Sequence, residues 1–183
     1  MLDNSKTIIT FASEKRGDSD LGDQSPLFYY GYKMIKKDRI ENVVKDFIRG
    51  TDLFLVGIKI SSSNRITVLA DSKTGITIDE CVSIHRHIES CLDRNTEDYE
   101  LQVSSPGLDV PFTVPEQYYK NEGKMIEVVD IDGNRFKGTL KNVTSGGFDL
   151  ETELKIKGQA SEIKDLSFNF DEVKSARESF VIK

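Results

Sequence analysis

LQVSSPGLDVPF, residues 101–112, divides this chain into two parts. Its first residues alternate apolar and polar side chains, as a half-buried strand does. Pro106 and Gly107 then predict a type II β-turn, because proline suits the second position and glycine accepts the positive φ of the third. The remaining residues are apolar but include Pro111, which does not suit a central strand. We therefore predict a proline-containing hinge, residues 108–115, between two domains.

Residues 34–107, before the hinge, show helix, strand, strand, helix and strand patterns in that order. Thr77 and Glu80 have the spacing of a capping box and mark the start of the second helix. Two helices on one face of a three-stranded sheet account for this α-β-β-α-β order. The predicted helices span 35–48 and 77–92, and the strands span 53–60, 65–70 and 99–104. The predicted buried stripe of the second helix contains Cys81, Ile84, Ile88, Cys91 and Leu92.

Residues 116–183, after the hinge, consist mainly of short apolar runs separated by turn residues. A single helical turn is predicted first, with Tyr118 and Tyr119 facing inward. About five short strands follow, which is typical of a small SH3-like or Sm-like β-barrel. The fold class is therefore α+β. The predicted strands are 125–129, 135–140, 148–154, 166–170 and 173–181.

Residues 1–33 lack any sustained period and carry 4 basic and 5 acidic side chains. They are predicted to be a disordered tail, or an over-extended start, because Met34 immediately precedes the first good helix. The alternative is that the aromatic run LFYYGY, residues 27–32, packs on the body of the protein or on a partner.

Composition indicates a folded cytoplasmic protein. Two cysteines are too few for a disulfide framework, and no apolar run approaches the roughly 18 residues of a membrane span. The net charge of −6 is spread along the chain, with 10 basic and 13 acidic residues in 34–115 and 11 and 13 in 116–183. Bulk binding of phosphate is excluded, so any contact with nucleic acid must be local.

The sequence offers no convincing catalytic, cofactor or metal site. His85 and His87 are two apart on a helix and point in different directions, so they do not chelate one ion. Cys81 and His85 have the spacing of a thiolate–imidazole pair, but Cys81 belongs to the predicted buried stripe. Asp130 and Asp132 lack the downstream glutamate of a calcium loop and predict a hairpin turn.

Two clusters of basic residues are candidate contacts for RNA. The first surrounds the first helix, and the second occupies nearly alternate positions of one predicted hairpin, where the side chains share a strand face. The alternative for both clusters is an ordinary solvated surface. The first cluster is Lys36, Lys37, Arg39 and Lys45; the second is Arg135, Lys137 and Lys141.

From Met34 onward the chain resembles the bacterial ribosome maturation factor RimP family. The resemblance is carried by the hinge motif, by GITIDEC at 75–81, by FKGTL at 136–140 and by FDEVKSAR at 170–177. One departure is Val110, where the family usually has arginine, so any contact of that arginine does not carry over. The motif and hinge residues are Ser104, Ser105, Pro106, Gly107, Leu108, Asp109 and Pro111.

The resemblance implies a non-enzymatic, monomeric cytoplasmic factor that binds the immature small (30S) ribosomal subunit and assists its assembly. It also implies that the C-terminal barrel docks small-subunit ribosomal protein twelve, with ribosomal RNA nearby. We expect the two domains to act as a clamp about the hinge. The alternatives are a stand-alone Sm-like RNA-binding module, which would form a ring, and a thiol enzyme, which would need an exposed and reactive Cys81.

Overall fold

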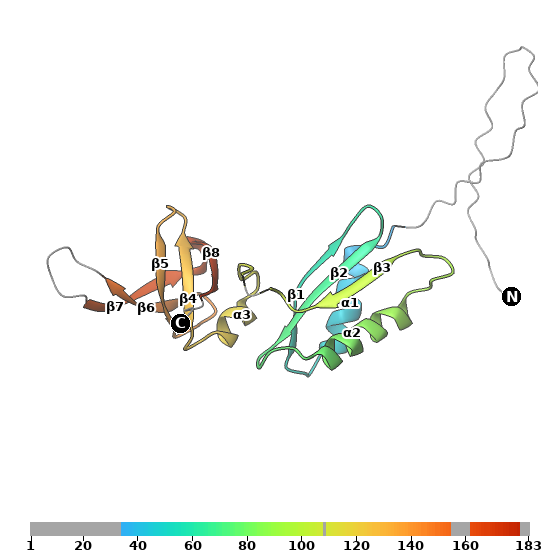
Figure 1. Ribbon diagram of the computed structural model, residues 1–183, viewed down its shortest axis with the longest axis horizontal. Coiled ribbons are helices and arrows are strands. Elements are labelled where there is room, and N and C mark those ends of the chain that lie inside the picture. Colours follow the sequence, from blue (N-terminus) through green and yellow to red (C-terminus); the bar gives the residue numbers. More distant parts are fainter. Residues whose placement is uncertain (1–33, 108, 155–161, 180–183) are drawn as a thin grey trace, which may run out of the picture.

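A computed structural model describes residues 34–107, 109–154 and 162–179, which form two separate β-sheets (Figure 1). The predicted tail, residues 1–33, lies outside the described residues, as does Leu108 of the hinge motif. The two sheets follow one another along the long axis of the molecule, and the hinge segment connects them. Each sheet has its own hydrophobic core.

The first sheet has the strand order β1-β2-β3, with β1 and β2 antiparallel and β2 and β3 parallel. Two helices pack on one of its faces, as the sequence predicts. The core between these layers includes the fully buried side chains of Ile40, Ile66 and Ile84. The elements are α1 (Lys37–Ile48), β1 (Leu53–Ile60), β2 (Arg65–Ser72), α2 (Ile78–Cys91) and β3 (Glu100–Ser104).

The start of α2 confirms the predicted capping box. The Thr77 hydroxyl accepts a hydrogen bond from the Glu80 N–H at 3.2 Å, and the Glu80 carboxylate accepts one from the Thr77 N–H at 2.7 Å. The predicted buried stripe is wrong at its cysteines, because Cys81 is half-buried and Cys91 is exposed. Both cysteines lie at the margin of the helix face that Ile84 and Ile88 bury. The buried stripe of α2 is therefore narrower than the set of apolar positions that the sequence pattern marks.

The second sheet is antiparallel throughout and has the order β7-β6-β5-β4-β8. Within the described residues β7 and β8 do not pair, so the predicted closure into a barrel is not shown. A one-turn 3₁₀-helix, η1, carries the chain from one edge strand to the other. The elements are α3 (Pro115–Lys120), β4 (Met125–Asp130), β5 (Arg135–Lys141), β6 (Gly147–Leu154), β7 (Glu162–Asn169), η1 (Phe170–Glu172) and β8 (Val173–Glu178).

Aromatic rings fill the core of the second sheet around Tyr118 of α3. Its ring lies 5.0 Å from Phe112, 5.2 Å from Phe148 and 4.9 Å from Phe170, between ring centroids. The pairs with Phe112 and Phe170 are edge-to-face, an arrangement that is favourable beyond the area it buries. The prediction that Tyr119 also faces inward is wrong: it is 47% exposed, because adjacent residues on a helix point about 100° apart.

The predicted type II turn at Ser105-Pro106-Gly107 is wrong. Among the described glycines, φ is positive at Gly50, Gly75, Gly123 and Gly133, and not at Gly107. The turn lies later, where the Val110 N–H donates to the Gly107 carbonyl at 3.2 Å. Proline disfavours helical φ and ψ in the residue before it, which favours an extended chain at Ser105 and a turn further along.

Candidate binding surfaces

The hinge motif lies between the two sheets and lines two hollows that share Ile76 and Ser105. Ser104 ends β3, and Ser105, Pro106 and Gly107 lie along a hollow of about 190 Å³ that reaches α3. Ser104 and Ser105 also line a groove of about 360 Å³ beside α2. The motif therefore contributes to a surface as well as to the connection between the sheets. Asp109, Val110 and Pro111 are exposed.

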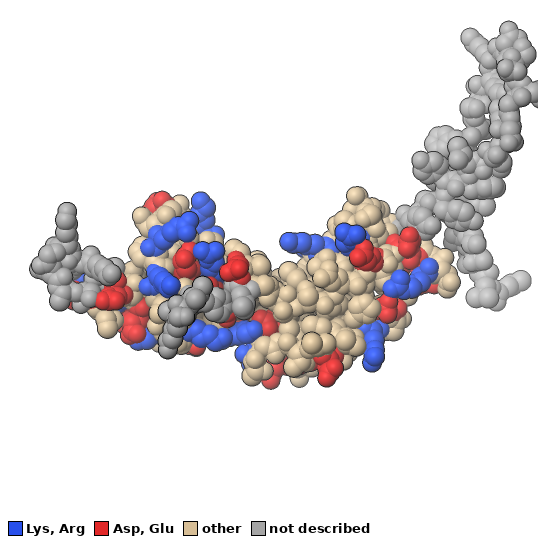
Figure 2. Space-filling model, viewed as in Figure 1, with Lys and Arg blue, Asp and Glu red and all other residues tan. Residues whose placement is uncertain are grey.

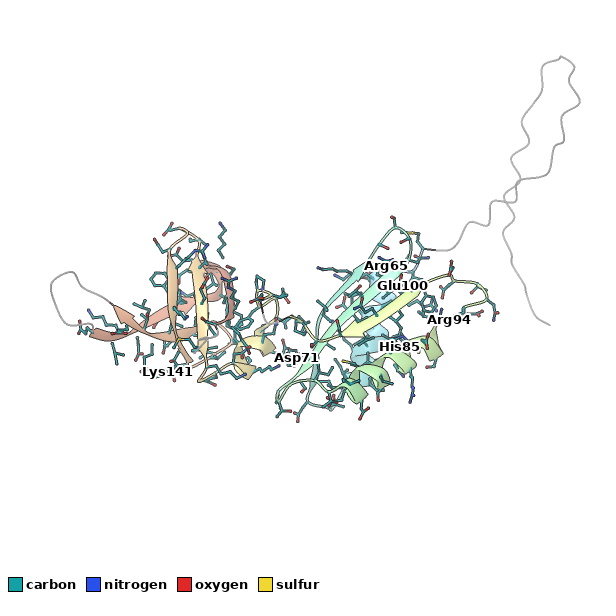
Figure 3. All side chains as sticks on the ribbon, viewed as in Figure 1. Arg65, Asp71, His85, Arg94, Glu100 and Lys141 are labelled. Atoms are coloured by element: carbon teal, nitrogen blue, oxygen red, sulfur yellow. The ribbon has the colours of Figure 1, made fainter. Side chains whose placement is uncertain are left out.

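Polar contacts join the hinge and α3 to the first sheet. The Lys120 ammonium lies 2.6 Å from the Asp71 carboxylate at the end of β2, and both side chains are largely buried, at 15% and 8% exposed. Asp71 also accepts hydrogen bonds from the backbone N–H groups of Ser72 and Ile76. The Thr113 hydroxyl donates to the Val56 carbonyl at 3.2 Å. Figure 3 shows Asp71 beside the segment that connects the two sheets.

The predicted basic cluster on α1 divides into two kinds of residue. Arg39 pairs with the carboxylate of Glu97, which is only 6% exposed, and donates to the Cys91 carbonyl at 2.9 Å. Lys45 pairs with Glu41 one turn away, at 2.6 Å. Lys36 and Lys37 are exposed and form no ion pair within the described part of the chain. These two lysines are therefore the members of the cluster that remain available to a phosphate.

The predicted cluster on β5 does share one strand face, but its charges are mostly neutralised. Arg135 lies 3.3 Å from Glu127, and Lys141 pairs with Glu151 on the neighbouring strand. The hydrogen bond that the Lys141 ammonium donates to the Glu151 carboxylate raises the pKa of Lys141. Lys137 is exposed and forms no ion pair within the described residues. Figure 2 shows basic and acidic side chains interspersed over this part of the molecule.

Of the side chains considered for catalysis, Cys81 and His85 line one groove beside α2, whereas His87 packs on Phe47 of α1. His87 stacks on Phe47 with 4.7 Å between ring centroids, and His85 lies 3.6 Å from Glu89. Burial, followed by the nearby carboxylates of Glu80 and Asp71, raises the pKa of the Cys81 thiol, which disfavours a thiolate nucleophile. Within the described residues, no group of three His, Cys, Asp or Glu side chains is placed to hold a metal ion.

The described surface combines exposed lysines at the start of α1 with two hollows, one beside α2 and one at the hinge. No helix in the described ranges is long and apolar enough to cross a membrane. Residues 43–109 match the family model described as the RimP N-terminal domain.

Curated relatives extend this similarity along the chain. The ribosome maturation factor RimP of Porphyromonas gingivalis is 37% identical over 131 residues, which cover 72% of this chain and 86% of that protein. The protein of the same name from Christiangramia forsetii is 32% identical over 129 residues, covering 70% and 80%. The protein of that name from Chlorobium limicola is 31% identical over 126 residues, covering 63% and 68%. The chain belongs to the ribosome maturation factor RimP family, which confirms the resemblance found in the sequence.

Proposed function

We propose that this protein binds the immature small ribosomal subunit in the cytoplasm and assists its assembly as a monomer. The observation that carries the proposal is its membership of the RimP family, whose members are named for ribosome maturation. The two separate sheets support it further, because each presents a surface of its own to a large partner while the Lys120–Asp71 ion pair and the Thr113–Val56 hydrogen bond join them.

We assign contact with small-subunit ribosomal protein twelve to the part of the chain from Glu116 onward. That part carries 11 basic and 13 acidic side chains, close to the 10 and 13 of residues 34–115, so the assignment rests on the family resemblance of its strands and not on net charge. The ion pairs of Arg135 and Lys141 support this assignment, because a cation held by a carboxylate is less available to a phosphate. Attraction between such surfaces speeds association and weakens with salt.

We assign contact with ribosomal RNA to Lys36 and Lys37, at the start of α1. A protein that neutralises phosphates releases counterions, so each contact steepens the dependence of affinity on salt. If these lysines make one phosphate contact each, their loss lowers the slope of log affinity against log salt by about 1.5.

Co-sedimentation of the full chain with immature small subunits tests the assignment to RNA. Lys36→Ala/Lys37→Ala is expected to weaken binding and flatten its salt dependence. The matched control is Lys45→Ala/Arg49→Ala, which removes one cation from α1 and one from its C-cap that are already paired with Glu41 and Asp46. Equal losses in both double variants would show that only overall charge matters, and would overturn the assignment of Lys36 and Lys37.

Cross-linking of the full chain to isolated ribosomal protein twelve tests the other assignment. Cross-links are expected at residues 116–183. Cross-links confined to residues 34–107 would contradict this division between the two sheets. A failure to sediment with immature subunits under any salt condition would overturn the proposed function itself.

A further inference from the structure

A polar hollow lies where the hinge and α3 meet the first sheet. Its volume is about 190 Å³, and its lining residues come from β2, the hinge motif, α3 and the end of β8, among others. Figure 3 shows Asp71, one of these lining residues, at this junction. A cavity of about 150 Å³ can hold a benzene ring, so the hollow has room for one six-membered ring. The hydrogen-bonding groups of its walls then decide which ring fits.

Gln117 of α3 carries a hydrogen-bond donor that no described residue accepts. Only 4% of this residue is exposed. Its side-chain oxygen accepts from the backbone N–H groups of Thr113 at 2.7 Å and Val114 at 3.3 Å, which leaves the NH2 group as the other end of the side chain. That NH2 group donates no hydrogen bond within the described part of the chain. Because Gln117 lines the hollow, its NH2 group is available to a ligand there.

The ammonium group of Lys120 adds further donors to the same hollow. One of its N–H groups is used by Asp71, at 2.6 Å. An ammonium has three N–H groups, and Lys120 donates no second hydrogen bond to the residues that the structure describes. Both oxygens of Asp71 are occupied, because the other one accepts from the backbone N–H groups of Ser72 and Ile76. These two side chains of α3 therefore present N–H groups that still lack acceptors.

The charges around the hollow balance, which favours a neutral ligand over an anion. Lys120 is matched by Asp71, and the Glu178 carboxylate lies 3.5 Å from the Lys124 ammonium. Glu178 lines the hollow with its side chain only 18% exposed, so it disfavours the entry of a phosphate or carboxylate group. The same carboxylate can accept a hydrogen bond from an N–H group of a neutral ligand.

We propose that the hollow binds one unpaired uracil base of RNA. Uracil has a carbonyl oxygen on each side of a ring N–H, so its edge offers acceptors to Gln117 and Lys120 and a donor to Glu178. The apolar side chains of Pro106 and Phe112, also on the lining, pack against the ring. Proteins recognise single-stranded RNA by hydrogen bonds to base edges and by packing against base faces. This inference rests on the proposed contact with ribosomal RNA and adds a base-reading site to it.

Titration of the full chain with uridine 5′-monophosphate, followed by NMR, tests the proposal. The side-chain NH2 signals of Gln117 are expected to shift as the nucleotide binds. Ribose 5-phosphate lacks the base, and cytidine 5′-monophosphate has an amino group in place of one carbonyl. Each is expected to bind about tenfold more weakly, because a buried donor then stays without an acceptor. Equal binding of ribose 5-phosphate would show that the phosphate alone is recognised, and would overturn the proposal.

A peptide ligand is the competing occupant, and acetyl-glutamine-amide is the probe for it. This compound carries amide carbonyl groups but no aromatic ring. Tighter binding of acetyl-glutamine-amide than of uridine 5′-monophosphate would assign the hollow to a peptide and overturn the proposal. Nucleotide binding that shifts signals elsewhere and leaves those of Gln117 unchanged would also overturn it.

Two matched variants locate the site. Gln117→Glu keeps the oxygen that accepts from Thr113 and Val114 but replaces the NH2 group by an acceptor, and is expected to weaken binding of uridine 5′-monophosphate about tenfold. Gln102→Glu adds the same charge at an exposed position of β3 and is expected to bind as the unaltered chain does. Equal affinity of the two variants would overturn the assigned site. The melting temperature shows whether each variant is folded, and the signals of the unaltered chain decide the outcome if Gln117→Glu is not.

The outcome is independent of the test of the proposed function. Free nucleotides replace the ribosomal subunit, so a failure of uridine 5′-monophosphate to bind would overturn the uracil site while leaving co-sedimentation with immature subunits unaffected. A failure to sediment, together with binding of the nucleotide at Gln117, would instead overturn the proposed function and retain the site.

Discussion

Two glycines that the sequence places in recognisable motifs meet different surroundings. A Cβ at Gly107 would contact Val110 at 3.5 Å, an ordinary van der Waals distance, and φ there is not positive. A Cβ at Gly138 on β5 would lie 2.3 Å from the backbone carbonyl oxygen of Glu151. We expect Gly107→Ala to change the free energy of unfolding by no more than about 1 kcal/mol, and Gly138→Ala to lower it by about 1–3 kcal/mol.

Chemical denaturation of both variants measures this difference. Gly133→Ala provides a control for backbone strain, because its φ of +87° costs energy although no atom lies near its Cβ. A large loss of stability in Gly107→Ala would mean that the chain turns differently at the hinge motif.

Arg39 shows that a cation predicted to contact RNA has a structural role. Removing its side chain leaves the buried Glu97 carboxylate without its ion-pair partner, and one Glu97 oxygen already has no hydrogen-bond partner among the described residues. We expect Arg39→Ala to lower the free energy of unfolding by about 1–3 kcal/mol, since an unsatisfied buried polar group is costly. Lys37→Ala, on the same helix and without an ion pair in the described structure, is expected to be close to neutral.

Thermal unfolding of both variants, and of Glu97→Gln, checks the role of Arg39. The double variant Arg39→Ala/Glu97→Gln is expected to lose less stability than the two single variants together, because the carboxylate is no longer left alone. Strict additivity would show that the two side chains do not stabilise one another.

At the level of elements, the start of α2 allows a direct test of capping. Thr77→Ala removes the acceptor of the Glu80 N–H and is expected to cost about 1 kcal/mol of stability. Thr77→Ser keeps the hydroxyl oxygen and is expected to retain most of that stability. Urea denaturation measures both, and an equal loss in the two variants would show that the lost methyl group matters more than the cap.

The capping box was predictable because its two residues lie three apart and are joined by local hydrogen bonds. The strands of the first sheet and the order of its elements along the chain were predictable for a similar reason, since their periods are local. Arg39 and Glu97 lie 58 residues apart, and nothing in either local pattern indicates that they meet. Burial at the margins of a helix was also poorly predicted, as Cys91 and Tyr119 show. Each of these exposed residues is adjacent in sequence to a buried one, Leu92 and Tyr118.

At the level of the whole molecule, the ion pair between Lys120 and Asp71 makes the connection between the sheets more than a flexible hinge. It joins residues 49 apart in sequence and is largely buried, whereas the predicted hinge relied on prolines alone. Removing one partner leaves the other charge poorly solvated. Asp71 retains two backbone donors, which limits the cost of losing Lys120.

We therefore expect Lys120→Met to lower the free energy of unfolding by about 1–3 kcal/mol and to increase the maximum dimension seen by small-angle X-ray scattering. The control is Lys124→Met, because Lys124 is 53% exposed and its ion pair with Glu178 lies within the C-terminal part of the chain. That variant is expected to scatter as the unaltered protein does. An unchanged scattering curve for Lys120→Met, together with a lower stability, would mean that Thr113 and the apolar contacts of the hinge hold the two sheets in place without the ion pair.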